Sequence, residues 1–188
     1  MVHAPDWTTQ ERLDYTERLF DQLAFLIPDG ISGGISTSPV SYKHWHTSDM
    51  ALDKAFTTGA ESMAKIVLQL EQIERNTGKY LHLDIEPEPD GMIENSDEVL
   101  YFYDTYLIPI ATQKLIAVLG CNKEKARDLI LRHITVCYDV CHFSLAYEEP
   151  EYTLAKFKSA GIKVGKIQVS SALKILFEEG DNEAIWHS

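Results

Sequence analysis

The stretch Tyr80–Gly91, which reads YLHLDIEPEPDG, constrains the fold of this chain more than any other part of it. It begins as an apolar strand that continues to Ile85. Pro87 and Pro89 stop the strand there, because proline has no N–H to donate to a sheet ladder. The strand therefore delivers the Glu86 carboxylate at its C-terminal edge, on a loop that two prolines stiffen.

A second stretch, Ile134–His142, repeats this design with the sequence ITVCYDVCH. An apolar strand runs to Asp139, and His142 follows where the strand turns into a loop. In α/β proteins, ligands bind at the carboxyl ends of parallel strands. The two stretches are therefore predicted to bring Glu86, Asp139 and His142 to one place.

Strands and helices alternate along the chain. Apolar periodicity and capping residues predict helices at 8–27, 49–76, 95–119, 122–133 and 150–160, and strands at 31–37, 80–86, 134–139 and 163–169. This alternation predicts parallel pairing with right-handed crossovers. We expect one α/β domain over residues 1–188, and the pattern alone leaves open whether the sheet is doubly wound or part of a (β/α) barrel.

Local signals add detail to this outline. Pro109 predicts a kink in the third helix, and the glycines of Ile31–Thr37 predict close backbone approach, as in a barrel wall. For residues 1–7 we predict only a turn, and for 140–149 a loop. The segment after residue 173 shows no clear element.

Composition restricts the classes of partner and compartment. The chain has 29 acidic and 17 basic residues, for a formal net charge of −12, which argues against nucleic acid and anionic membranes as partners. No apolar run is long enough to span a bilayer and no signal-peptide pattern opens the sequence, so we expect no membrane insertion. Three cysteines, an odd number, argue against a disulfide framework and favour the reducing cytoplasm.

The residues at the strand ends suit a metal. Carboxylate and imidazole groups at Glu86, Asp139 and His142 are ligands for Mn²⁺, Mg²⁺, Fe²⁺ or Zn²⁺. Such an ion can grip two adjacent oxygens of a hydroxy-carbonyl substrate and polarise the carbonyl, and Glu88 or Asp90 would be near enough to act as a base. The alternative is that the acids only cap the following turns and that the histidine bonds a backbone carbonyl. On spacing alone, that alternative is slightly favoured.

The last strand and the cysteines offer weaker candidates. Gln168 lies within the last strand and Ser170 at its end, but a neutral amide is a weak metal ligand and is as readily a buried hydrogen-bonding group. Cys137 and Cys141 lack the spacing and the second pair of a zinc site. We assign Cys137 to the core.

The loop after the first strand gathers aromatic and basic side chains at Tyr42–His46. We expect Lys43, His44, Trp45 and His46 to be able to cover a sugar or a phosphate, with Lys43 and Trp45 as the substrate contacts. An ordinary solvated loop, with Trp45 as its hydrophobic anchor, explains the same residues.

Four motifs together resemble one known family, and they read GISTSPVSYK, LDIEPEPDG, VCYDVCHFSLAYEEP and VGKIQVSSAL. They are similar to motifs of the metabolite-traffic proteins of the Ebo gene cluster, a branch of the xylose-isomerase-like TIM barrels, and the resemblance runs from about His3 to Leu173. It implies the fold of sugar isomerases and epimerases and a role in the export or processing of a metabolite.

The resemblance also implies roles for single residues. In the wider superfamily a Glu, an Asp, a His and a second Glu at successive strand ends hold a divalent metal, and a pair of glutamates moves the proton. Glu86 matches the first Glu, Asp139 matches the Asp, and His142 matches the histidine that contacts substrate. Gln168 stands where the superfamily usually has its metal-binding His, which weakens the case for a tight metal site, and the last Glu has no counterpart.

The number of strands implies an incomplete barrel. Family members have eight strands, whereas this chain supplies about four, corresponding to the fourth through seventh, and a complete TIM barrel typically needs ~250 residues. We therefore expect a partial (β/α)8 barrel with strands missing at both ends. Such a half-barrel would expose two sheet edges and an apolar inner layer, which favours a homodimer.

The resulting hypothesis is a divalent-metal-dependent (Mn, Mg or Zn) isomerase or epimerase that acts on a sugar or sugar-like metabolite. Its site residues form three overlapping groups: metal ligands Glu86, Asp139 and Gln168; catalytic residues Glu86 and His142; and substrate contacts Lys43, Trp45, Glu88 and Ser170. The rival is a non-catalytic barrel that binds a metabolite or a partner protein in a traffic pathway, which the glutamine favours. A metal-dependent phosphodiesterase is a third possibility, against which the net charge and the scarcity of basic clusters count.

Overall fold

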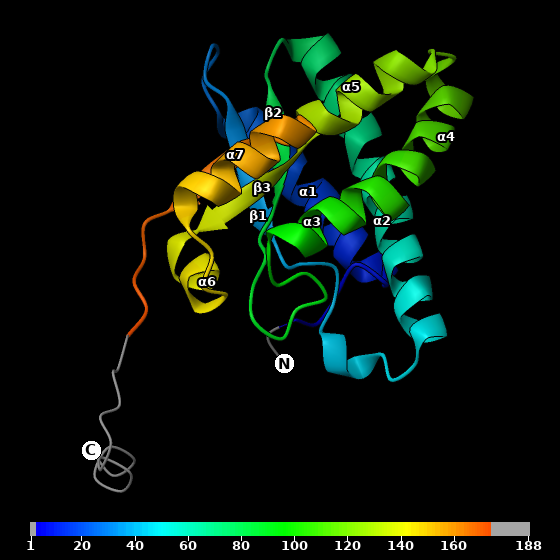
Figure 1. Cartoon of the computed structure of the whole chain (residues 1–188). Helices are drawn as coiled ribbons and strands as arrows, with labels where there is room; N and C mark the ends of the chain where they lie inside the picture. The colour runs from blue at the N-terminus through cyan, green and yellow to red at the C-terminus, as the bar shows by residue number, and fades with distance from the viewer. Residues whose placement is uncertain (1–2, 174–188) are drawn as a thin grey trace, which may run out of the picture.

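Four parallel strands form the sheet in a computed structural model that describes residues 3–173. The strands are β1 (Gly33–Thr37), β2 (Leu81–Ile85), β3 (Ile134–Asp139) and β4 (Val164–Gln168). They pair in the order β1-β2-β3-β4, so each new strand joins its predecessor after a helical crossover (Figure 1). This order is that of a barrel wall, and the predicted fold class, a partial (β/α)8 barrel, is confirmed. The segment for which no element was predicted lies outside the described residues.

Residues 3–173 contain seven α-helices, of which α1 precedes the first strand and the other six lie in the crossovers. These are α1 (Gln10–Leu26), α2 (Asp49–Thr77), α3 (Ser96–Phe102), α4 (Ile108–Leu119), α5 (Lys123–His133), α6 (Val140–Leu145) and α7 (Pro150–Ala160). A short 3₁₀ turn, η1 (Lys43–Trp45), lies in the loop after β1. None of the described helices is both long and apolar enough to cross a membrane.

The irregularity predicted at Pro109 lies just before it. A π-helical turn, η2 (Tyr103–Leu107), interrupts the helix, and Pro109 falls in the first turn of α4. In the first turn of a helix a proline's missing N–H costs least, because that N–H would have no partner within the helix. The π-helical turn before it accommodates the interruption of the helical hydrogen bonds.

One face of the sheet packs against helices. Leu81, Leu83 and Ile85 of β2 are fully buried, and they belong to the same apolar cluster as Ile66 and Leu70 of α2. Helices α2 and α5 contact β2, and α5 also contacts β3. The apolar positions of β2 and β3 therefore form the core, as their alternation predicts, whereas Ile167 of β4 is 57% exposed.

The opposite face of the sheet is polar, so the expectation of an apolar inner layer is wrong. His82 Nδ1 lies 2.7 Å from Asp84 Oδ1, and the Thr135 hydroxyl donates to the same carboxylate oxygen. Lys166 Nζ donates to Ser36 Oγ at 2.6 Å. The inner face is thus joined by hydrogen bonds between strands. The homodimer was expected because the inner layer would be apolar. That reason no longer holds, and the homodimer stays a prediction.

Glycines make room for this inner network. A Cβ atom built at Gly34 would collide with His82 and with Oδ2 of Asp84, and one built at Gly165 would collide with Oδ1 of Asp84 and with Thr135. The close backbone approach predicted for the glycines of the first strand is confirmed at Gly34. The polar pair of β2 fits only because a glycine of the adjacent strand β1 and a glycine of β4, two strands away, carry no side chain there.

The N-terminal segment is more ordered than the predicted turn. Trp7 is fully buried, its Nε1 donates to Thr37 Oγ1 at 2.8 Å and its backbone N–H donates to the Val40 carbonyl at 3.0 Å. Asp6 accepts a hydrogen bond from the Ser41 hydroxyl. The segment is therefore fastened to the end of β1, a long-range contact that no local sequence signal announces.

Candidate functional site

Three parallel strands deliver polar side chains to one edge of the sheet. Glu86 follows the last residue of β2, and Asp139 and Gln168 are the last residues of β3 and β4. Gln168 Nε2 donates to Glu86 Oε1 at 2.8 Å and to Asp139 Oδ2 at 2.6 Å. The structure thus brings the three predicted metal ligands together, with the amide between the two carboxylates.

Asp139 serves the fold as well as the site. It caps α6, because Oδ1 accepts from the Cys141 backbone N–H at 3.0 Å, and the Ser170 hydroxyl donates to the same oxygen. Burial is the largest influence and alone would raise the pKa of this carboxyl, but hydrogen bonds from Ser170, Cys141 and Gln168 together lower it to about 2. Asp139 is therefore an anion throughout the physiological range.

His142 lies on a helix, and the loop predicted for residues 140–149 is wrong at this point. Val140–Leu145 is too short to show helical periodicity, and the cap at Asp139 starts it. His142 Nδ1 lies 3.1 Å from the Pro87 carbonyl oxygen and 3.7 Å from Glu86 Oε1. A carbonyl oxygen only accepts, so Nδ1 carries the hydrogen and the lone pair of Nε2 is left for another partner.

Cys141 belongs to the same cluster, although the sequence argument set it aside. One potential ligand atom from each of Asp139, Cys141 and His142 lies within 4.8 Å of the other two. Contact with Ser170 would lower the pKa of the thiol, but contact with Asp139 and burial raise it overall. The pattern Asp-x-Cys-His at a strand-to-helix turn was the available signal in the sequence. The absence of a second cysteine pair, for which Cys141 was set aside, does not exclude a mixed group of this kind.

Glu88 stands beside the cluster, on the loop after β2. His3 Nδ1 lies 3.4 Å from Glu88 Oε1. Burial is the main influence on Glu88 and raises its pKa, with Glu86 and Asp139 adding to the rise while His3 and His142 oppose it. His3 is a residue that the sequence argument missed, because it reaches this position only through the fastening of the N-terminal segment.

The two loop residues predicted to contact substrate lie in different surroundings. Trp45 is 40% exposed and meets the ring of Tyr42 edge-on, with centroids 5.5 Å apart, and Tyr42 stacks on His3 at 5.3 Å. Lys43 instead pairs with Glu94 at 2.8 Å, which raises the pKa of the lysine. The aromatic side chain is thus linked to the cluster through two rings, whereas the structure directs the lysine to a different carboxylate.

The types of donor suit a divalent cation, although Glu86 is not part of the compact group that Asp139, Cys141 and His142 form. Glu86 and Asp139 offer carboxylate oxygens and His142 offers an imidazole nitrogen, the mixture that Mn²⁺, Mg²⁺ and Zn²⁺ accept. The N–H groups of Gln168 lie between the two carboxylates, so this point of the site already favours positive charge. Rotation of the amide would turn its oxygen to the same place.

Comparisons with known proteins bear on the fold. No protein-family model and no curated protein matches the chain. Among solved structures, the 3-keto-D-glucoside 4-epimerase YcjR from E. coli, in its apo form, is similar over 86% of this chain and 54% of that one, with a TM-score of 0.50 and 16% sequence identity. The chain thus spans about half the length of that epimerase. At such low identity the likeness shows the fold alone, and the finer resemblance to Ebo-cluster proteins stays a prediction.

Proposed function

We propose that this chain is part of a divalent-metal-dependent isomerase or epimerase that acts on a sugar or a sugar-like metabolite. The observation that supports it most is the convergence of Glu86, Asp139 and His142, with Gln168, at the carboxyl edge of neighbouring parallel strands. The fold likeness to a protein described as a sugar epimerase is consistent with the proposal.

Glu86, Asp139 and His142 would hold the ion, with Gln168 as a fourth, weaker ligand through its amide oxygen. A bound divalent ion would polarise a substrate carbonyl and so acidify the C–H next to it. Asp139 suits this role because its low pKa keeps it charged. Ser170 and the Cys141 N–H orient that carboxylate from the side opposite the amide contact.

Glu88 is the residue to which we assign proton transfer. Its raised pKa brings the carboxyl nearer to neutral pH, where an acid–base group works best. Its position between His3 and the cluster lets it face a bound ligand. Trp45, linked through Tyr42 and His3, would cover the apolar face of a sugar ring.

A non-catalytic metabolite-binding role is the second candidate, and Gln168 favours it. The amide already bridges the two carboxylates through N–H donors, an arrangement that is complete without a cation. A barrel that binds a metabolite in a traffic pathway needs no more than such a rigid polar site.

Solvent exchange distinguishes the two candidates without knowledge of the product. The chain would be incubated in D₂O with a panel of keto sugars and Mn²⁺, and deuterium incorporation next to the carbonyl would be followed by NMR. The enzyme hypothesis expects incorporation that a chelator abolishes and that Glu86→Gln reduces by about a hundredfold or more. Glu61→Gln removes one charge from an exposed position on α2 and serves as the matched control.

A parallel titration with Mn²⁺ tests the metal alone. We expect one site per chain, weakened by about tenfold or more in Glu86→Gln and unchanged in Glu61→Gln. Equal Mn²⁺ affinity in all three proteins would refute the metal assignment. Sugar binding that survives the chelator without any exchange would favour the non-catalytic candidate.

A further inference from the structure

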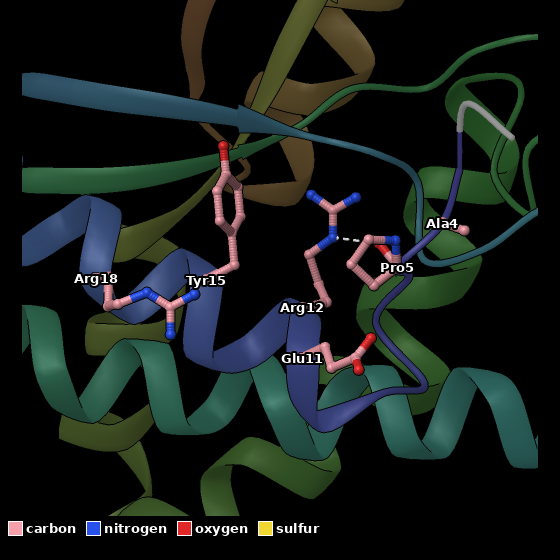
Figure 2. Close-up of a pocket in the computed structure, with 6 residues that line it drawn as sticks. All are labelled: Ala4, Pro5, Glu11, Arg12, Tyr15 and Arg18. Carbon is pink, nitrogen blue, oxygen red and sulfur yellow. Dashed lines mark hydrogen bonds between the residues drawn. The ribbon is translucent and has the colours of Figure 1, made fainter.

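A pocket of about 420 Å³ lies between α1 and the N-terminal segment, and none of its lining residues belongs to the candidate site. Six residues line it, drawn in Figure 2: Ala4, Pro5, Glu11, Arg12, Tyr15 and Arg18. The volume is in the range of pockets that hold small molecules, roughly 300–1,000 Å³.

The periodicity of α1 produces this lining. Leu13, Thr16 and Phe20 are the buried residues of the helix. Arg12, Tyr15 and Arg18 follow one another at intervals of three residues, so they share another stripe of the same helix. Two positive charges and one hydroxyl therefore belong to the lining of the same pocket, with Tyr15 between the two arginines in Figure 2.

Arg12 is held in place at its Nε atom. That nitrogen donates to the Pro5 carbonyl oxygen at 2.7 Å, the contact drawn as a dashed line in Figure 2. The two terminal nitrogens point away from the proline in the same view. The guanidinium is thus fixed in orientation while its two-pronged end is left for another partner.

No acidic side chain neutralises Arg12 within residues 3–173. No carboxylate of these residues lies within ion-pairing distance of it, and the same holds for Arg18. Asp6 is near enough to favour the charge, but its two oxygens already accept from Thr8 and Ser41.

Charge and burial make the unpaired guanidinium informative. Arg12 is half-buried, and burial lowers its pKa, the direction expected for a cation that loses water without gaining a carboxylate. The chain as a whole carries a charge of −12, so a pocket lined by two unpaired cations differs from the average of the chain. Glu11 is the one acid in the lining, which leaves the pocket with a net positive charge.

We propose that this pocket binds a small oxyanion, a phosphate or carboxylate group, with the terminal nitrogens of Arg12 as a bidentate donor and Arg18 and Tyr15 as additional donors. Planar, fork-like donation is the geometry with which arginine recognises both groups. The proposal does not depend on the candidate active site, because none of its residues belongs to that cluster.

Calorimetric titration of the full chain tests the proposal. Inorganic phosphate and, separately, acetate would be added at constant ionic strength, with a chelator present so that no metal contributes. We expect saturable binding of at least one anion, weakened about tenfold or more by Arg12→Lys, which keeps the charge but loses the fork, and by Arg18→Ala. Arg127→Ala, which removes an exposed arginine from α5, should bind like the unaltered protein.

The outcomes separate a site from general charge. Tighter phosphate binding would identify a phosphoryl ligand, and tighter acetate binding a carboxylate ligand. The proposal fails if the unaltered chain binds neither anion saturably, if Arg12→Lys and Arg18→Ala bind as well as it does, or if Arg127→Ala weakens binding equally. Arg18 is exposed, so its substitution decides the question even if Arg12→Lys loosens the N-terminal segment.

Discussion

The inner face of the sheet has two layers, and similar acidic residues have different roles in each. In the upper layer, Glu86 and Asp139 lie at the strand ends around an amide. In the lower layer, one step down β2, Asp84 is fully buried beside His82 and Thr135. The lower pair is enclosed by glycines, whereas the upper acids open onto loops. Acidic residues on one strand can therefore build the barrel wall in one layer and a site in the next.

The largest effect should come from filling the space in the lower layer. Gly34→Ala would place a methyl group against Asp84 and His82, and we expect it to lower the free energy of unfolding by about 3 kcal/mol. Gly120→Ala is the control: its Cβ meets nothing, and only its left-handed backbone should cost about 1 kcal/mol. Urea unfolding of the two variants measures both. Equal losses would show that the lower layer is not tightly enclosed.

A smaller effect should follow from removing one hydrogen bond of the lower layer. Thr135→Val keeps the shape of the side chain but deletes the hydroxyl that donates to Asp84. We expect a loss of about 2 kcal/mol, because a buried carboxylate oxygen then keeps only His82 of its two side-chain partners. The upper-layer counterpart is Ser170→Ala, which should cost less since water can reach that edge. A Ser170→Ala loss as large as that of Thr135→Val would erase the contrast between the layers.

The contribution of the upper layer to stability should depend on pH. The folded pKa of Asp139, about 2, is below the ordinary value of 3.8, so its charge stabilises the fold above that value and this contribution disappears as the pH falls towards 2. At pH 7 we expect Asp139→Asn, which keeps the helix cap, to be less stable by about 1 kcal/mol. Urea unfolding of both proteins between pH 7 and pH 2 should show the two curves converging. A difference that stays constant with pH would contradict the assignment.

The smallest change in stability is expected for a substitution that should change the affinity for Mn²⁺. Gln168→His places an imidazole where the amide now bridges two carboxylates, and we expect the free energy of unfolding to change by about 0.5 kcal/mol or less. The Mn²⁺ affinity should rise by about tenfold, since imidazole is a better ligand than an amide. Calorimetry with Mn²⁺ measures it. An unchanged affinity would mean that the upper layer is not arranged for a metal.

The sequence was informative where the physics is local. Pro87 and Pro89 end β2, and the alternation of apolar residues identifies the core face, so the order of elements and the meeting of Glu86, Asp139 and His142 could be predicted. Gln168 was placed with them only by the family resemblance. The inner layer was misjudged because barrels usually fill it with branched apolar residues. Nothing in the spacing of His82 and Asp84 says that glycines on two other strands make room for them.

Contacts across long separations were beyond prediction. Trp7 meets Thr37 across 30 residues, and His3 reaches Glu88 only as a result. Short elements were also missed, because α6 spans six residues and its start depends on one cap. The arginines of α1 form an ordinary charged stripe until the N-terminal segment closes one side of it.

The place of His3 has a practical consequence for the design of reagents. Its Nδ1 lies 3.4 Å from Glu88 Oε1, so anything fused to the N-terminus joins the chain two residues before a side chain that contacts the carboxylate cluster. A purification tag of histidines attached there would add imidazoles near this cluster, and Mn²⁺ bound by the tag would be counted as binding at the proposed site. Tag-free protein is therefore the reagent from which metal stoichiometry at this edge should be read.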